Sequence, residues 1–140
     1  MNGPRPPTRP GRAERPGRKE LESGRPSVAR MERTGPSLGE LLVDVWRQAI
    51  AEGRTEFLVG SKRCTVGRTR AQGLRTVTFA HGDVVLEGIE QNPEKTSRWA
   101  QLAREGKRIM QFRCGRRYVA NVCEGTLLRY PAWKGLGLPD

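Results

Sequence analysis

The sequence has little of the chemistry that marks most enzymes and metalloproteins. Its 140 residues include one histidine, three cysteines and only 6% aromatic residues. The cysteines (Cys64, Cys114 and Cys123) form no C-x-x-C pair, and their odd number argues against a disulfide framework. Phosphate-binding-loop, H-E-x-x-H and nucleophile-elbow patterns are absent, and His81 falls at an expected turn. We therefore expect reduced thiols, no catalytic residue, no metal and no cofactor.

Long apolar runs are also missing. No segment approaches the roughly 20 apolar residues that a membrane-spanning helix needs. The basic N-terminus is not followed by the apolar segment of a secretory signal. Together with reduced cysteines, this predicts a cytoplasmic protein that has no contact with a membrane.

Acidic residues are scarce relative to basic ones. The chain has 26 lysines and arginines against 15 acidic residues, a formal net charge of +11. Such an excess attracts polyanions and anionic surfaces, although charge alone does not identify the ligand. Nucleic acid is therefore the first partner to consider.

Proline and arginine are concentrated in residues 1–36, which hold seven of the ten prolines and nine of the 26 basic residues. This segment has almost no large apolar side chains, so it cannot offset the entropy lost on ordering and is expected to be a disordered arm. A basic arm of this kind can follow phosphates along a groove. The alternative is a start at Met31, with residues 1–30 not translated.

The folded part begins at Ser37, where Ser37-Leu-Gly-Glu40 forms a capping box. Apolar residues at helical spacing follow, and Gly53 is a typical helix stop. Alternating apolar residues and turn residues then indicate strands. Strands are expected over residues 57–59, 63–69, 74–80, 84–89, 109–114, 118–123 and 126–130.

A second helix is expected over residues 93–105, between the fourth and fifth of these strand segments. Asn92 is a suitable N-cap, and proline suits the first helical position that follows it. Trp99 is expected to anchor the helix in the core. Capping does not account for Glu90 and Gln91, the two polar residues ahead of the cap.

The resulting order is α-β-β-β-β-α-β-β-β, which predicts an α+β fold. Mostly antiparallel, curved sheet would pack with two helices in a single domain over residues 37–131, followed by a flexible tail over 132–140. If Gly82-Asp83 forms a two-residue turn, Phe79 lies opposite Leu86 and one face of that hairpin is apolar.

The turns that join the last three strands set their register. In this register Arg113 lies across from Tyr118, with Arg129 one strand beyond, on one face of the sheet. Phe112 and Val119 are expected on the opposite, apolar face. A slip of one residue would invert this assignment.

Basic and aromatic side chains interleaved on a sheet face can hold single-stranded nucleic acid, because cations meet phosphates while a base stacks on a ring. The alternative is a solvated face on which arginine packs over tyrosine. Further basic residues lie at the neighbouring turn and on the outer side of the second helix. The candidate nucleic-acid contacts are Arg113, Tyr118, Arg129, Arg116, Arg117, Lys95 and Arg98.

A second basic segment surrounds the Ala71-Gln72-Gly73 loop. Arg68, Arg70 and Arg75 flank this loop, which makes it a further candidate for contact with phosphate. The leading hypothesis is therefore a small, non-catalytic binding module that contacts RNA or DNA through the phosphate backbone, with an affinity that falls as salt is added.

Two alternatives remain open. The first is a protein–protein adaptor or a subunit of a larger assembly, with Trp46 or Trp133 as the anchor of the interface. The second is an enzyme whose active site is not marked by any recognisable sequence motif. A deep cleft that gathered His81, a cysteine and Glu90 would favour it.

Overall fold

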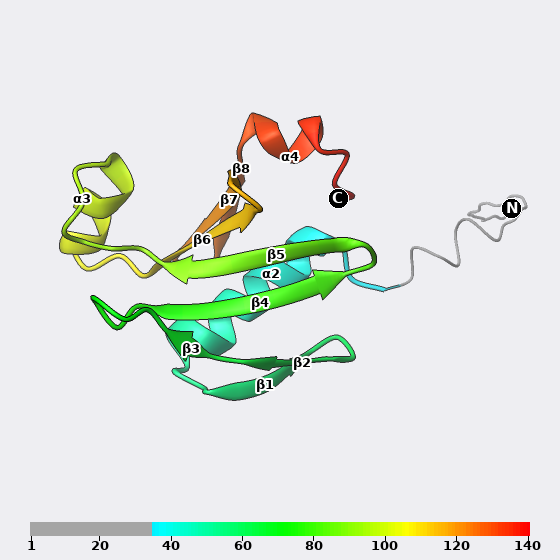
Figure 1. Cartoon of the computed structure of the whole chain (residues 1–140), viewed down its shortest axis with the longest axis horizontal. Coiled ribbons are helices and arrows are strands. Elements are labelled where there is room, and N and C mark those ends of the chain that lie inside the picture. Colours follow the sequence, from blue (N-terminus) through cyan, green and yellow to red (C-terminus); the bar gives the residue numbers. More distant parts are fainter. Residues whose placement is uncertain (1–34) are drawn as a thin grey trace, which may run out of the picture. The chain divides into compact units, whose positions relative to one another are not determined.

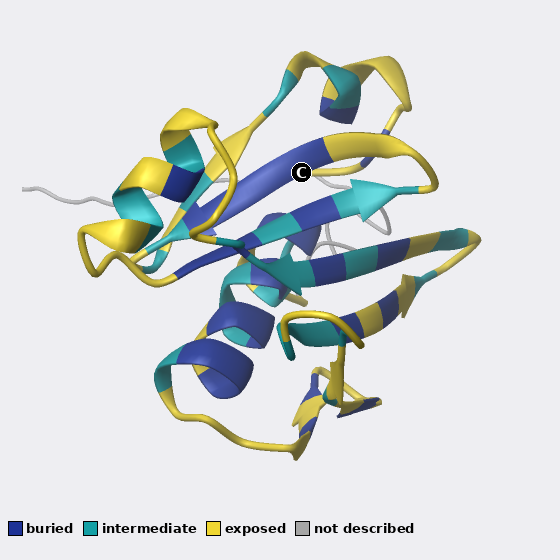
Figure 2. Ribbon diagram, turned by 60° about the vertical axis from the view of Figure 1, so that its left-hand side comes forward, coloured by how far each residue is buried: buried dark blue, intermediate teal, exposed yellow. Residues whose placement is uncertain are grey.

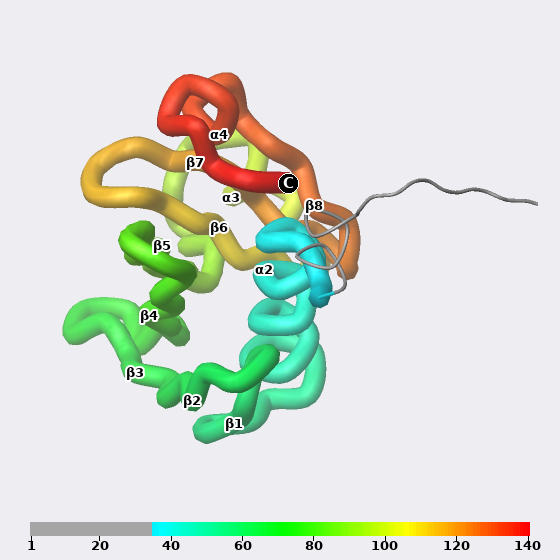
Figure 3. Tube along the Cα trace, turned by 90° about the vertical axis from the view of Figure 1, so that its right-hand side faces the viewer, coloured from blue at the N-terminus to red at the C-terminus, as the bar shows by residue number. Residues whose placement is uncertain are grey.

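Helix α2 (Leu38–Trp46) lies on the inner side of a curved antiparallel sheet, and Figure 3 shows the strands following one another in an arc around it. The computed structural model describes residues 35–140. The arm expected over residues 1–36 lies outside the described residues, except for its last two positions. No helix in residues 35–140 is long and apolar enough to cross a membrane.

The sheet confirms the expected α+β fold and its antiparallel strands (Figure 1). Six strands run in sequence order from β3 to β8, and β1 and β2 form a separate hairpin. The predicted pairing of Phe79 with Leu86 is confirmed. The strands are β1 (Glu56–Val59), β2 (Lys62–Thr65), β3 (Gly67–Arg68), β4 (Arg75–His81), β5 (Val84–Glu90), β6 (Ile109–Cys114), β7 (Arg117–Cys123) and β8 (Thr126–Arg129).

The capping box at the start of α2 is confirmed. Glu40 N donates to Ser37 Oγ (3.2 Å), and Ser37 N donates to Glu40 Oε1 (2.9 Å). The helix then continues as a π-helical turn, η3 (Arg47–Ala51), in which Glu52 N donates to Arg47 O (2.8 Å). The wider π turn leaves backbone carbonyls for other partners at the end of the helix.

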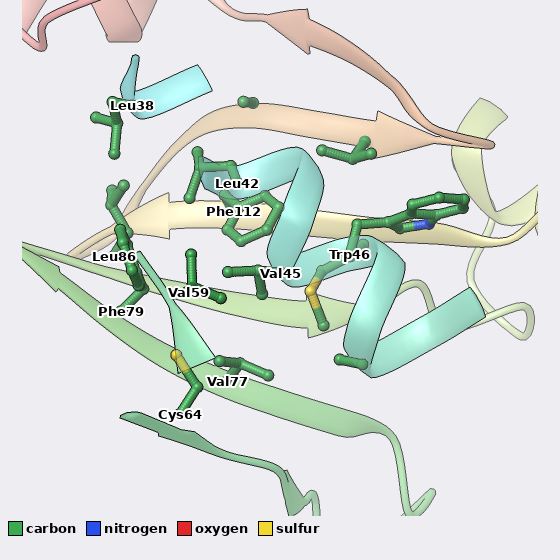
Figure 4. Packing of buried hydrophobic residues seen from close by; sticks show 14 of the residues in the cluster. Leu38, Leu42, Val45, Trp46, Val59, Cys64, Val77, Phe79, Leu86 and Phe112 are labelled. Atoms are coloured by element: carbon green, nitrogen blue, oxygen red, sulfur yellow. The ribbon is translucent and has the colours of Figure 1, made fainter. Parts of the chain in front are cut away.

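The core lies between α2 and the inner face of the sheet. Figure 4 shows Leu42 and Val45 of the helix pointing toward Phe112, Phe79 and Leu86 of the strands. Figure 2 shows the alternation of buried and exposed residues along the strands that a one-sided core requires. Burial of these apolar side chains supplies most of the driving force for folding.

Gly88 of β5 has no room for a side chain, because it lies opposite Phe112 of β6. A Cβ at this position would lie 2.7 Å from the Phe112 ring and 2.8 Å from Met110 Sδ. Since both side chains are fully buried, we expect Gly88→Ala to lower the free energy of unfolding by about 1–3 kcal/mol through overpacking. Urea denaturation measures this change. Gly135→Ala is the control, because nothing lies within 4 Å of a Cβ there. A loss of stability in this control as large as in Gly88→Ala would show that the effect does not come from overpacking at Gly88.

The C-terminal residues are not the flexible tail that the sequence predicted. Residues 131–135 form α4 (Pro131–Gly135), and Trp133 and Leu138 are buried in the core cluster. Leu38 N donates to Asp140 O (3.1 Å), so the chain end is hydrogen-bonded to the start of α2. The prediction failed because a segment with few apolar residues is fixed here by two side chains that pack on distant elements.

Trp46 is also buried, and its indole Nε1 donates to Arg108 O (3.0 Å). Trp46 and Trp133 are only 6% and 3% exposed. Neither tryptophan is therefore available as the surface anchor that the protein–protein hypothesis assigned to it.

Helix α3 (Arg98–Arg104) starts later than expected. Its N-cap is Ser97, whose Oγ accepts from Ala100 N (3.1 Å), whereas the expected cap, Asn92, accepts from Glu94 N in a local turn (2.9 Å). Trp99 is half-buried and lies outside the main core cluster, so it is not the core anchor that was expected.

Candidate functional site

A β-bulge divides the surface that the sequence predicted as the nucleic-acid interface. Arg113 pairs with Tyr118 as expected, but Phe112 pairs with Ala120, so Val119 is an extra residue in β7. Arg129 pairs with Ala120 and therefore shares the inner face of the sheet with Phe112. Its assignment to the face of Arg113 and Tyr118 was wrong, because the bulge inverts the faces beyond it.

Arg129 takes part in the packing of the C-terminal segment. Its guanidinium lies over the Trp133 ring, 5.0 Å from the centroid, and its Nε is 3.9 Å from Asp140 Oδ1. The contact with Trp133 stabilises α4 against β8, whereas the pair with the exposed Asp140 contributes little. Arg129 therefore has a structural explanation that needs no ligand.

Arg113 already has an acidic partner. Its Nε and Nη2 donate to Glu87 Oε1 at 2.9 and 2.6 Å. The hydrogen bonds that the guanidinium donates to this carboxylate raise the pKa of Arg113. Arg116 and Arg117, at the adjoining turn, are exposed, and no acidic side chain among residues 35–140 forms a salt bridge with them.

Lys95 and Arg98 lie at the opposite end of the sheet from this turn. They precede β6, whereas Arg116 and Arg117 follow it, and six strand residues span about 20 Å. Figure 1 shows α3 at one end of β6 and the turn into β7 beyond the other. The seven predicted contacts therefore form at least two separate groups.

A cleft of about 500 Å³ lies at the end of the sheet near α3. It is formed by three segments that are distant in sequence, together with Ile50 of η3. The lining residues are Ile50, Arg68, Gln72, Gly73, Leu74, Arg75, Glu90, Gln91, Asn92, Pro93, Glu94, Ala103, Gly106, Lys107, Arg108 and Ile109. The structure thus brings the basic loop after β3 beside Glu90 and Gln91, two features that the sequence singled out separately.

Arg75 and Glu90 hold two walls of the cleft together. Arg75 Nη1 donates to the carbonyl oxygens of Ala49 (2.8 Å) and Ile50 (3.2 Å) at the end of η3. Glu90 Oε1 accepts from Arg75 N (3.0 Å), and the two side chains form a salt bridge. A cation at the C-terminus of a helix also interacts favourably with the helix dipole. This pair is structural and sets the position of the strand ends.

The charge that remains at the cleft is positive. Four cations and two carboxylates line it, but Arg75 is paired with Glu90 and Arg108 with Glu124. Arg68 and Lys107 are exposed, and no acidic side chain in the described part of the chain forms a salt bridge with either. These two residues are called the cleft cations below.

Arg104 adds charge beside the wall of the cleft. Its Nη1 donates to Pro93 O (2.5 Å) and Lys95 O (2.8 Å), so the guanidinium lies against the segment before α3. Through this contact Lys95, one of the predicted residues, is placed next to the cleft. Arg70 belongs to the same loop as Gln72 and is exposed.

Arg108 is fixed on the other side of the cleft. Glu124 Oε2 accepts from Arg108 N (2.6 Å), and Oε1 accepts from Nη2 (2.8 Å). The guanidinium also lies over the Trp46 ring, 5.8 Å from its centroid. The hydrogen bonds from Arg108 lower the pKa of the Glu124 carboxyl from 4.5 to about 2.

Because folding lowers this pKa, ionised Glu124 stabilises the fold above pH 4.5, and the contribution disappears as the pH falls toward 2. We expect Glu124→Gln to be less stable than the wild type at pH 7, with the difference closing near pH 2. Urea denaturation of both proteins across this range measures it. A difference that is the same at pH 7 and pH 2 would show that the ion pair does not carry the effect.

Groups typical of catalysis do not meet in the cleft. His81 ends β4 at the far end of the sheet, and none of the three cysteines lines the cleft. Burial raises the pKa of the Cys64 thiol, which keeps it protonated and unreactive. Among residues 35–140, no group of three or more His, Cys, Asp or Glu side chains is placed to hold a metal ion.

Comparisons with protein-family models, with curated proteins and with solved structures found no match to this chain. Function therefore has to be inferred from the site itself. The cleft was only partly predictable: the loop of Arg68 and Arg75 and the unexplained pair Glu90-Gln91 were visible in the sequence. The sequence could not place Lys107 and Ala103 in the cleft, because their position beside that loop depends on how the strands pair.

Proposed function

We propose that this protein is a non-catalytic module that binds nucleic acid through its phosphate backbone, at the cleft end of the sheet. The observation that carries the proposal is the gathering of unpaired cations there. Arg68 and Lys107 line the cleft, Arg104 and Lys95 lie beside it, and Arg70 is in the same loop as Arg68. Cations without acidic partners are the groups that phosphates attract and from which bound counterions are released.

The net charge of the folded part supports the same function. Residues 37–140 contain 17 basic and 11 acidic residues. Most of the acidic side chains are already bonded to arginines, as in the pairs Arg75–Glu90, Arg108–Glu124 and Arg113–Glu87. The excess charge therefore resides on side chains that are free to meet a polyanion.

The surface predicted from Arg113, Tyr118, Arg116 and Arg117 remains a second possible contact region for the same ligand. It is the weaker candidate, because Arg113 is neutralised by Glu87 and the turn residues do not line the cleft. Both regions contribute to attraction at long range.

Binding is tested with the full chain and a fluorescein-labelled oligonucleotide, by fluorescence anisotropy over a salt series. We expect binding at about 50 mM salt and a linear fall of log affinity with log salt, with a slope near −0.7 for each phosphate contact to a single strand. Failure to bind single strands or duplex at about 50 mM salt would contradict the proposal.

A further inference from the structure

The cleft is larger than contact with backbone phosphates requires. Its volume of about 500 Å³ falls in the range of roughly 300–1,000 Å³ that is usual for small-molecule sites. Ile50, Leu74 and Ile109 are among its lining residues, and Ile109 is 2% exposed. A surface that binds phosphates alone has no need of a hollow of this size with apolar side chains among its polar lining residues.

Gln91 provides a second, independent observation. It lines the cleft, is only 4% exposed, and donates from Nε2 to Asn92 O (3.3 Å). Its Oε1 is buried without a hydrogen-bond partner among the described residues. A buried acceptor without a donor is unfavourable, so a ligand that brings an N–H group to Gln91 is bound more tightly for that reason.

We infer that the cleft accepts one unstacked nucleotide of single-stranded nucleic acid, with its base among the apolar residues and its phosphate at the cleft cations. This inference rests on the proposed function and further specifies that the bound nucleic acid is single-stranded. The flat face of the base lies mainly against Leu74, the most exposed of the three apolar residues, with Ile50 and Ile109 behind it. The neighbouring phosphates lie toward Arg68 and Lys107, which are exposed.

The charges of the cleft favour this orientation over the reverse one, in which a phosphate would lie inside the cleft and the base outside. Glu90 and Glu94 belong to the wall, and no basic side chain among residues 35–140 forms a salt bridge with Glu94. The carboxylate of Glu94 repels the negatively charged phosphates of a strand but not a neutral base. The base therefore occupies the interior and the phosphates stay at the cationic rim.

Gln91 would bind the base without selecting its identity. Bases in single strands are read through their Watson–Crick edges, and each of the common bases carries an N–H donor there. One acceptor at Gln91 Oε1 satisfies any of them. A base in a duplex cannot reach this position unless it leaves the stack and its pair, which is unfavourable. The inference therefore predicts a preference for single strands and little preference for sequence.

Two substitutions in the full chain distinguish the contribution of the cleft to binding from that of the cations. Gln91→Leu removes the acceptor while keeping the size of the side chain, and Ala103→Trp fills the cleft without changing the charge. The probes are a fluorescein-labelled DNA strand of about 12 nucleotides, within the usual site size of single-strand binders, and the duplex of the same sequence.

We expect the wild type to bind the strand more tightly than the duplex at equal salt. Gln91→Leu should weaken strand binding about fivefold, the loss of one hydrogen bond. Ala103→Trp should weaken it by at least about fivefold, because base contacts with the cleft are lost. Neither change should alter the affinity for the duplex, which meets only the cations.

Equal binding of strand and duplex, with both variants like the wild type, overturns the inference and leaves the proposed function standing. Absence of binding to either probe by the wild type overturns the proposed function as well. Thermal denaturation shows whether the variants are folded. If Ala103→Trp unfolds the domain, Gln91→Leu decides alone, because it replaces a buried amide by a side chain of similar volume.

Discussion

Reversing the two cleft cations, in the double variant Arg68→Glu/Lys107→Glu, should weaken nucleic-acid binding about 25- to 60-fold at about 0.1 M salt. At this salt concentration each phosphate contact contributes about five- to eightfold through counterion release, and two are lost. The slope of log affinity against log salt should become shallower by about 1.4 to 1.8. Fluorescence anisotropy over a salt series measures both quantities.

The double variant Arg116→Glu/Arg117→Glu is the matched control. It changes the net charge by the same amount, on exposed residues at the opposite end of β6. Long-range attraction therefore falls equally in both proteins, and only local contacts differ. If the control loses as much affinity as the cleft variant, binding does not depend on the cleft. If it loses more, the contact surface is the turn that the sequence predicted.

Trp133→Ala should lower the free energy of unfolding by about 3–5 kcal/mol, the usual loss for truncating a buried tryptophan. Trp133 is 3% exposed, belongs to the core cluster and lies under the guanidinium of Arg129. In a domain of this size the melting temperature should fall by more than about 10 °C. Thermal denaturation followed by circular dichroism measures the change.

Leu136→Ala in the same segment is the control, because Leu136 is 41% exposed and its truncation leaves no cavity. We expect it to change the melting temperature by only a few degrees. If Trp133→Ala melts like the wild type, the C-terminal segment contributes nothing to the core. Residues 132–140 would then be the loose tail that their composition indicates.

Local signals in the sequence predicted the local structure well. The capping box at Ser37 and Glu40 and the pairing of Phe79 with Leu86 are both confirmed, since each depends on a few neighbouring residues. The start of α3 was wrong because two capping signals compete, and Ser97 stands closer to the apolar stripe of the helix than Asn92 does.

The site was harder to predict, because it depends on tertiary structure. No glycine or proline at Val119 indicates the bulge in the sequence. The bulge nevertheless places Arg129 on the inner face of the sheet. The sequence shows the basic loop and the polar pair Glu90-Gln91, but it does not show that they lie beside each other. Only the antiparallel path of β4, β5 and β6 places the loop beside Lys107.

Nucleic acid is proposed to bind at the cleft end of the sheet. This proposal is tested most directly by two-dimensional ¹H–¹⁵N NMR spectra of the full chain titrated with an unlabelled single-stranded oligonucleotide. We predict that the largest amide shifts fall in residues 68–75, 90–95 and 104–109, which form and flank the cleft. Shifts confined to residues 113–118, or the absence of any shift in the folded domain, would contradict this proposal.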